Sequence, residues 1–247
     1  MKTVLSFSGG LDSTVLLYHL LDQGDEVVCL NFCYGSKHNE TERKSANEIC
    51  RQANIPCHNI DLPFLGKLFS SDLLIGGGPI PLGHYEDESM RQTVVPYRNG
   101  ILLSIAVGYA ESIDADRVAL ANHAGDHAIY PDCRPEWVQA MNLASWHGTY
   151  NHISIHTPFT HKHKGEICEL GIQLGAPLQL TWTCYQGGEI PCGECGSCNE
   201  RKEAFEYTGT TDPILPWGES LFGITPFPKQ TNTEVTEHLA TGKFDLN

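Results

Sequence analysis

The feature that most constrains the fold is a Ser/Gly-rich loop at residues 6–14, which follows the β-prone residues 2–5. Its sequence, SFSGGLDST, predicts a strand, a Gly-Gly turn and then a helix over about residues 13–23. Gly9 and Gly10 carry no Cβ, so the backbone there can adopt unusual dihedral angles and approach a ligand closely. A helix that begins at this point offers unpaired N–H groups and the positive end of its dipole to an anion. The loop therefore predicts a phosphate site.

The spacing of this loop differs from two common phosphate-binding motifs. It does not match the Walker A pattern of a glycine, four residues and Gly-Lys-Ser/Thr, and it lacks the three glycines of a dinucleotide-binding fingerprint. An ordinary Ser/Gly-rich turn between a strand and a helix is the remaining alternative.

A second strong pattern is a set of four cysteines near the end of the chain, spaced C-x7-C-x2-C-x2-C. Glycines and a proline between them let the backbone fold around a metal, and four thiolates are the usual ligands of a closed structural Zn²⁺ site. An iron–sulfur cluster also takes four cysteines, usually at other spacings. Disulfides need an oxidising compartment, and the N-terminus shows no signal-peptide pattern. We therefore expect a reduced, cytoplasmic protein with structural zinc bound by Cys184, Cys192, Cys195 and Cys198.

Composition limits the class of protein and its partners. A chain of 247 residues with 40% hydrophobic content can form one α/β domain with a sizeable core. No apolar run approaches the ~20 residues that span a bilayer. Sixteen basic against thirty acidic residues give a net charge of −14, which opposes a broad nucleic-acid-binding surface. We expect neither a membrane nor a nucleic acid as a direct partner.

Apolar clusters alternate between strand and helix patterns along the chain, which predicts a doubly wound α/β fold with a parallel sheet. In such a sheet, ligands bind beyond the carboxyl ends of the strands. We expect strands at residues 2–7, 26–32, 57–62 and 117–121, and helices at 13–23, 42–53, 98–112, 135–145 and 164–174. Residues 63–95 are rich in loop formers. The domain prediction is an α/β domain at 1–207, including the zinc segment 184–198, and an irregular tail at 208–247.

Three other segments carry polar residues that suit a site at this sheet edge. Lys37 and His38 follow the second predicted strand, although a solvated loop would look the same. Arg98 begins a predicted helix, where a cation opposes the helix dipole; this suggests a ligand anion, with a surface arginine as the alternative. The turn YPDCR at residues 130–134 joins a carboxylate, a thiol and a guanidinium, and Asp132 could equally be a helix N-cap.

Together these segments resemble the 7-cyano-7-deazaguanine synthase family, a branch of the ATP pyrophosphatase (PP-loop) superfamily. Members of the superfamily cleave ATP to AMP and pyrophosphate to adenylate a substrate. The resemblance covers residues 2–207 in collinear order and rests on SGGLDST (8–14), YGSKH (34–38), VPYRN with LLSIA (95–106), YPDCR (130–134), Thr157-Pro158 with Lys164, and LTWTCY (180–185) leading into the cysteines. The chain departs from the usual family pattern at Ala121, Ala128, Ile129 and His163.

The resemblance implies an adenine nucleotide alpha hydrolase-like, Rossmann-like fold and a homodimer. It implies conversion of 7-carboxy-7-deazaguanine and ammonia to 7-cyano-7-deazaguanine (preQ0), with ATP and Mg²⁺. The implied pyrophosphate-binding residues are Phe7, Ser8, Gly9, Gly10, Leu11, Asp12, Ser13 and Thr14. The implied catalytic residues are Asp12, Lys37, His38, Arg98 and Lys164, and the implied base-binding residues are Tyr130, Asp132 and Arg134.

Two alternatives remain open at this stage. A tRNA-modifying thiolase or a lysidine-forming ligase of the same superfamily also adenylates its substrate, but a net charge of −14 does not favour RNA binding. A non-catalytic nucleotide-binding sensor would keep the loop, and the intact Asp12 and Lys164 argue against it.

Overall fold

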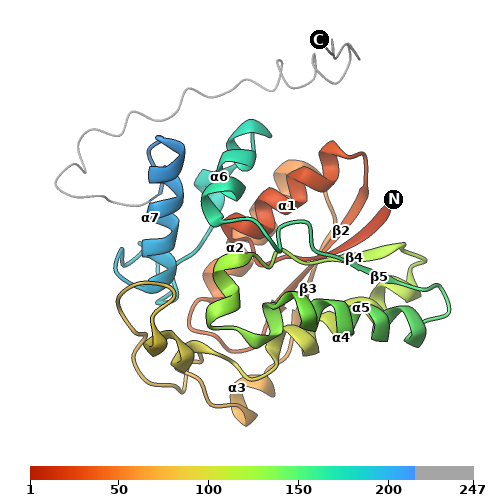
Figure 1. The fold of residues 1–247 in the computed structure, drawn as a ribbon, viewed down its shortest axis with the longest axis horizontal. Helices are drawn as coiled ribbons and strands as arrows, with labels where there is room; N and C mark the ends of the chain where they lie inside the picture. The colour runs from red at the N-terminus through yellow and green to blue at the C-terminus, as the bar shows by residue number, and fades with distance from the viewer. Residues whose placement is uncertain (215–247) are drawn as a thin grey trace. The chain divides into compact units, whose positions relative to one another are not determined.

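The computed structural model describes residues 1–214, which form a parallel sheet covered by helices on both faces (Figure 1). The strand order is β3-β2-β1-β4-β5, with all neighbouring pairs parallel, so the predicted doubly wound α/β fold is confirmed. The order reverses direction between β1 and β4, which places a crevice at the carboxyl ends of these two strands. The strands are β1 (Lys2–Ser6), β2 (Glu26–Cys33), β3 (Cys57–Asp61), β4 (Arg117–Ala119) and β5 (Ser154–His156).

The helices form two layers. In Figure 1, α1, α6 and α7 lie on one side of the sheet, while α4 and α5 lie together on the other. The helices are α1 (Leu11–Asp22), α2 (Asn39–Ala53), the short α3 (Leu65–Leu68), α4 (Arg98–Ser112), α5 (Pro135–Gly148), α6 (Lys164–Gln173) and α7 (Gly196–Thr208). Short 3-10 helices are η1 (Glu88–Thr93), η2 (Ala124–Ala128), η3 (Pro131–Cys133) and η4 (Leu178–Leu180). None of the helices described is both long and apolar enough to cross a bilayer.

The main core lies between the sheet and α1, α2, α6 and α7. Val4 and Leu5 of β1 are both fully buried although they point to opposite faces, as expected of a central parallel strand covered on both sides. Leu5 packs in one cluster with Val15 and Leu16 of α1 and Ile49 of α2. Full burial of each such side chain contributes about 1.5–3 kcal/mol, so this layer holds the amino-terminal end of α1 firmly against β1.

Most predicted elements are present, with shifted ends. α1 begins at Leu11 rather than at residue 13, because the chain turns into the helix directly after Gly10. β4 ends at Ala119, two residues earlier than predicted. β5 and α7 were not predicted, since β5 is only three residues long and α7 buries charged side chains that interrupt an apolar pattern. Residues 208–214 are described, whereas the rest of the predicted tail lies outside the described residues.

The segment after α7 is attached to the domain by a buried ion pair. Arg201 and Asp212 are both fully excluded from solvent, with Arg201 Nε 2.6 Å and Nη2 3.0 Å from the two carboxylate oxygens. Arg201 also donates to Thr181 Oγ1, Thr183 Oγ1 and the carbonyl of Leu178. The guanidinium therefore joins α7, the residues around η4 and the chain that follows α7.

Asp212→Ala should lower the free energy of unfolding by about 3–5 kcal/mol, because it leaves a buried guanidinium without its counter-ion. Urea or thermal unfolding at fixed metal concentration measures the change. Glu206→Gln is the matched control: Glu206 forms an exposed pair with Lys202 on the same helix, and its loss should barely alter stability. Equal stability of the two variants would contradict the structural role of Asp212.

Candidate functional site

The loop between β1 and α1 is shaped to approach a ligand with its backbone. Gly9 has a φ of +80°, and a Cβ there would lie 2.6 Å from the backbone nitrogen of Ala46, so only glycine fits. Ser8 Oγ accepts from the Gly10 N–H at 3.1 Å and lies 3.1 Å from Ser13 Oγ. α1 has no side-chain cap at its start, so its first N–H groups remain open to an anion.

A cavity opens beside this loop at the carboxyl edge of the sheet. Its walls come from the ends of β1, β2 and β4, the first turns of α1, α2, α4 and α6, and the residues around 182–185. Its polar lining residues include Ser8, Asp12, Ser13, Tyr34, His38, Glu42, Tyr85, Arg98, Asn99, Asn122, His123, Asp126, Tyr130, Lys164, Thr183, Tyr185 and Ser197. Phe7, Gly10 and Leu11 of the loop also line it.

A buried lysine joins three helices at one wall of the cavity. Lys164, the first residue of α6, has its ammonium 3.1 Å from Asp12 Oδ2 in α1 and 2.7 Å from Glu200 Oε2 in α7. The ammonium also lies 5.8 Å from the centre of the Tyr85 ring. His123 Nε2 is 3.9 Å from Asp12 and 3.8 Å from Glu200. We call Asp12, His123, Asp126, Lys164 and Glu200 the Lys164 group.

The charges of this group are set by burial and by one another. Burial disfavours the ionised form of Asp12, but Lys164 and His123 outweigh it and lower the pKa of the carboxyl. Burial would likewise lower the pKa of Lys164, yet Asp12 and Glu200 raise it well above its ordinary value. Burial raises the pKa of Glu200, against the opposing effect of Lys164. The lysine therefore stays cationic at neutral pH, directly beside the phosphate loop.

A second set of side chains forms the wall near β2, α2 and α4. The guanidinium of Arg98 donates to Tyr34 Oη at 3.0 Å and to Asn99 Oδ1 at 3.1 Å. His38 Nε2 lies 3.6 Å from Glu42 Oε2 one helical turn along α2. We call Tyr34, His38, Glu42, Arg98 and Asn99 the Arg98 group. It places one partly buried cation and one carboxyl group in the same wall.

The structure brings together many, but not all, of the residues that the sequence indicated. Phe7, Ser8, Gly10, Leu11, Asp12, Ser13, His38, Arg98, Tyr130 and Lys164 line the cavity. Gly9 lies under the loop against α2, and Thr14 is fully buried.

Three predicted site residues do not line this cavity, and their roles in the reaction stay predictions. The ammonium of Lys37 donates hydrogen bonds to the carbonyl oxygens of Asp72 and Gly78, and so holds the loop after α3. Asp132 accepts from the backbone N–H of Asn99 at 2.8 Å, which ties η3 to the start of α4. Arg134 donates to the carbonyl of His127. Each of these polar groups is used to fix a loop.

Several cavity residues escaped the sequence analysis. His123 and Asp126 follow β4 at the carboxyl edge, so the strand-edge rule that selected His38 could have found them. Glu42 is one of three glutamates of α2, and Glu200 is one of three glutamates of α7. No local pattern separates either of them from its solvated neighbours. Their positions depend on how α2 and α7 pack.

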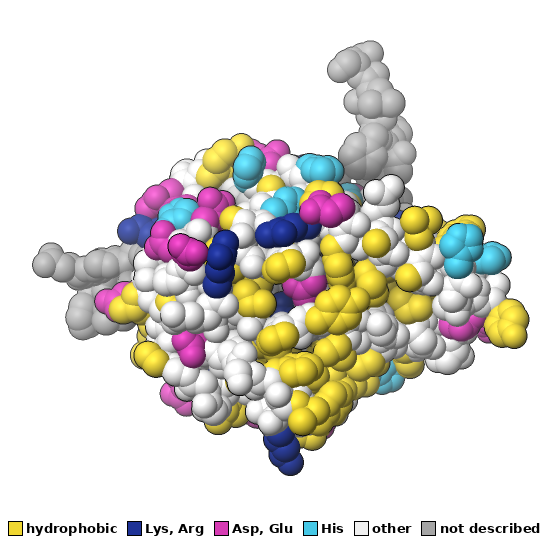
Figure 2. All heavy atoms as spheres, turned by 60° about the horizontal axis from the view of Figure 1, so that its bottom comes forward, with side chains coloured by type: hydrophobic (Ala, Val, Ile, Leu, Met, Phe, Trp, Pro, Cys, Tyr) yellow, Lys and Arg dark blue, Asp and Glu magenta, His cyan; other side chains and the backbone are white. Residues whose placement is uncertain are grey.

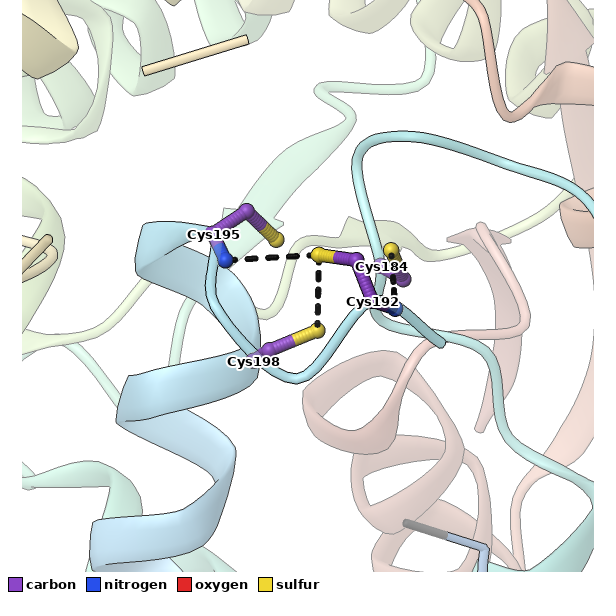
Figure 3. Close-up of side chains that lie close together, drawn as sticks. All are labelled: Cys184, Cys192, Cys195 and Cys198. Atoms are coloured by element: carbon purple, nitrogen blue, oxygen red, sulfur yellow. Dashed lines mark hydrogen bonds between the residues drawn. The ribbon is translucent and has the colours of Figure 1, made fainter. Parts of the chain in front are cut away.

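The four cysteines converge as predicted (Figure 3). Cys184 and Cys192 come from the loop before α7, Cys195 precedes that helix, and Cys198 lies in its first turn. One sulfur from each lies within 4.8 Å of the others, and Cys184, Cys195 and Cys198 are fully buried. Tetrahedral zinc with bonds of about 2.3 Å would need sulfurs about 3.8 Å apart, so the cluster fits one such ion after a small contraction. The four cysteines can therefore hold a metal ion.

Comparison with known proteins places this site in a family. The model of the queuosine biosynthesis protein QueC family matches residues 2–209. A 7-cyano-7-deazaguanine synthase from Desulfotalea psychrophila is 49% identical over 84% of this chain and 94% of its own length. One from Methanoregula boonei is 47% identical over 87% of this chain and 98% of its own length.

The chain belongs to the QueC family. The resemblance to 7-cyano-7-deazaguanine synthases is thereby confirmed, and the chain is an enzyme of that kind by descent. Among solved structures, a predicted subunit of tRNA methyltransferase from Methanocaldococcus jannaschii matches with a TM-score of 0.49 at 14% identity, over 89% of this chain and 94% of its own.

Purified protein should carry about one tightly bound metal ion per chain on the four cysteines. Cys198→Ser should lose that ion and unfold at a clearly lower temperature, because binding energy at such a site is folding energy. Cys57→Ser, at a half-buried cysteine outside the cluster, should keep the ion. Elemental analysis and thermal unfolding of both variants measure this. A Cys198→Ser protein with full metal content would contradict the assignment.

Proposed function

We propose that this enzyme converts 7-carboxy-7-deazaguanine and ammonia into 7-cyano-7-deazaguanine (preQ0) at the expense of ATP. Family membership supports the reaction. The observation that supports it in the structure is one cavity that joins the loop between β1 and α1, the buried Lys164 and the partly buried guanidinium of Arg98. Such a cavity suits a reaction between a nucleoside triphosphate and a second anion, here the carboxylate of the base.

The chemistry requires two activations. A carboxylate oxygen attacks the α-phosphorus of ATP, pyrophosphate leaves, and the base becomes an acyl adenylate. Ammonia adds to the acyl carbon, and AMP leaves with the formation of an amide. The amide oxygen then attacks the α-phosphorus of a second ATP and pyrophosphate leaves. Loss of AMP and of both amide protons gives the nitrile. Every step displaces a phosphate-bearing leaving group, so the protein contributes mainly positioning and neutralisation of charge.

The residues of the cavity divide these tasks. The open N–H groups at the start of α1 and the hydroxyls of Ser8 and Ser13 bind the pyrophosphate portion of ATP. Lys164 neutralises charge that develops on the α-phosphate and the leaving group. Arg98 pairs with the carboxylate of the base before it is adenylated. Tyr130 contributes a hydroxyl on the side of the base.

ATP brings a divalent cation, and we propose Mg²⁺. The residues fit it, because Asp12 Oδ1 is buried and has no partner among the described residues. A carboxylate oxygen is the kind of ligand that Mg²⁺ takes in triphosphate sites, together with phosphate oxygens. When bound, the ion neutralises phosphate charge, and Asp12 would hold it. For the four cysteines we propose structural Zn²⁺; elemental analysis that found iron with acid-labile sulfide would contradict this choice.

We also propose a cytoplasmic homodimer. None of the ten cysteines, which all lie in the described residues, forms a disulfide, and this suits a reducing compartment. Figure 2 shows hydrophobic side chains gathered in a broad patch on the face that lies at the bottom of Figure 1, the side of α4 and α5. Tyr97, Leu143 and Trp146 on this side are about half exposed. An apolar area of this kind is characteristic of a protein–protein contact.

Leu143→Asp should therefore shift the protein from dimer to monomer, because it places a charge in the proposed interface. Analytical ultracentrifugation over a range of concentrations measures the equilibrium. Ile172→Asp is the control, since Ile172 is an exposed apolar residue of α6, on the opposite side of the sheet. A wild-type monomer at every concentration would contradict the proposal.

Incubation of the enzyme with the 7-carboxy base, ammonium, ATP and Mg²⁺ should release AMP and pyrophosphate and yield the nitrile.

Lys164→Gln should lower kcat by about 10²–10³-fold, because it removes the buried cation beside the phosphates. Lys162→Gln, two residues earlier and outside the cavity lining, should retain full activity. Mass spectrometry of the base and a pyrophosphate assay measure both. ATP cleavage that does not depend on the base would rule out the proposed substrate, and an amide product without nitrile would limit the reaction to its first half.

A further inference from the structure

Among the acidic residues that line the cavity, Glu42 is the one whose carboxyl group accepts no hydrogen bond from another described residue. It lies in the first turn of α2, lines the cavity, and only 16% of its side chain is exposed. The atom that comes nearest as a partner is His38 Nε2, at 3.6 Å, beyond hydrogen-bond distance. By contrast, Asp12 and Glu200 each contact the ammonium of Lys164.

The neighbours of Glu42 are engaged elsewhere. His38 Nδ1 lies 3.3 Å from the carbonyl oxygen of Tyr185, so this nitrogen carries the proton and Nε2 presents a lone pair to Glu42. Burial lowers the pKa of His38 to about 4, so the ring stays neutral. Arg98 directs its donors to Tyr34 and Asn99. Burial, opposed by Arg98, raises the pKa of Glu42 to about 8.

A largely buried carboxyl group that faces a cavity and accepts no hydrogen bond from the protein is stabilised when a ligand supplies the donors. The pyrimidine ring of a 7-deazaguanine offers two parallel donors, the ring N1–H and the 2-amino group, which match the two oxygens of a carboxylate. The same base carries a carboxylate at its other end, and Arg98 lies in the same wall as Glu42. The wall thus presents an acceptor for one end of the base and a cation for the other.

We propose that Glu42 recognises the N1–H and 2-amino edge of the substrate base and so determines which deazapurine the enzyme accepts. This inference rests on the proposed function and adds a specificity-determining residue to it. On binding, Glu42 gives up its proton to solvent, and its two carboxylate oxygens accept hydrogen bonds from the N1–H and the 2-amino group of the base.

The adenine ring of ATP is the competing occupant, and its chemistry differs in a way that can be tested. Adenine presents one donor, the 6-amino group, next to one acceptor, N1, and therefore pairs with a protonated carboxyl rather than with a carboxylate. An amide also offers one donor and one acceptor. Glu42→Gln would therefore keep an adenine contact and break a contact with the deazaguanine edge.

Glu42→Gln should raise the KM for the 7-carboxy base on the order of ten- to a hundredfold, because a buried donor of the base meets the amide NH₂. The KM for ATP should stay within about twofold, since no contact with ATP is removed. Glu40→Gln is the matched control, because Glu40 is an exposed residue of the same helix outside the cavity lining. Circular dichroism and thermal unfolding confirm that each variant is folded.

A 7-carboxy base without the 2-amino group should be a poorer substrate than the 7-carboxy base for wild type, and this difference should disappear in Glu42→Ala.

Calorimetry supplies a second readout that a purely structural role would not move. Binding of the base at pH 7 should release about one proton from wild type, seen as a dependence of the binding enthalpy on the buffer, and none from Glu42→Gln. An unchanged KM for the base in Glu42→Gln, or a raised KM for ATP in Glu42→Ala alone, would overturn the inference. Wild-type pyrophosphate release with the base tests the proposed function separately, because it does not depend on either variant.

Discussion

The buried ammonium of Lys164 is the interaction on which the arrangement of the site depends. An unpaired charge in this position would cost several kcal/mol, so the two carboxylates that flank it must be held in place. Asp12 is fixed because α1 begins directly after the phosphate loop, and α1 packs on the core of the sheet. Glu200 is fixed because α7 begins within the cysteine cluster, whose Cys198 lies two residues before Glu200. The cysteine cluster therefore helps to position the helix that supplies one counter-ion of Lys164.

Helix α7 is anchored a second time by Arg201, the residue that follows Glu200. Arg201 is fully buried and binds Asp212 together with oxygens around η4. Adjacent residues of α7 thus form two separate ion pairs, one to the cavity and one to the segment after the helix. This explains why α7 has so weak an apolar pattern: two of its buried positions are charged.

The sequence was most informative where the chemistry is local. The loop at residues 6–14 and the cysteine array each lie within a short segment whose spacing determines the geometry. The predicted strand–turn–helix junction and the convergence of the four cysteines are both confirmed. The order of strands and helices was also predictable, because each element carries its own periodicity. His123, Glu200 and Glu42 could not be found in the same way, since their roles arise only when elements far apart in the chain pack together. Lys37 and Arg134 illustrate the converse case, because each hydrogen-bonds backbone carbonyls of nearby loops and does not line the cavity.

Gly9 has a consequence that reaches beyond the phosphate loop. The place of its missing side chain is filled by the backbone of α2, with the Glu42 carbonyl 2.9 Å and the Ala46 nitrogen 2.6 Å from where a Cβ would stand. Two rigid elements in such close contact cannot slide past each other. With the role proposed for Glu42, this contact fixes the distance between the carboxylate that recognises the base and the loop proposed to bind the phosphates. A base that is one ring shorter, or that carries its carboxylate on a longer arm, would hold the reacting oxygen out of line with the α-phosphorus however well its edge were bound.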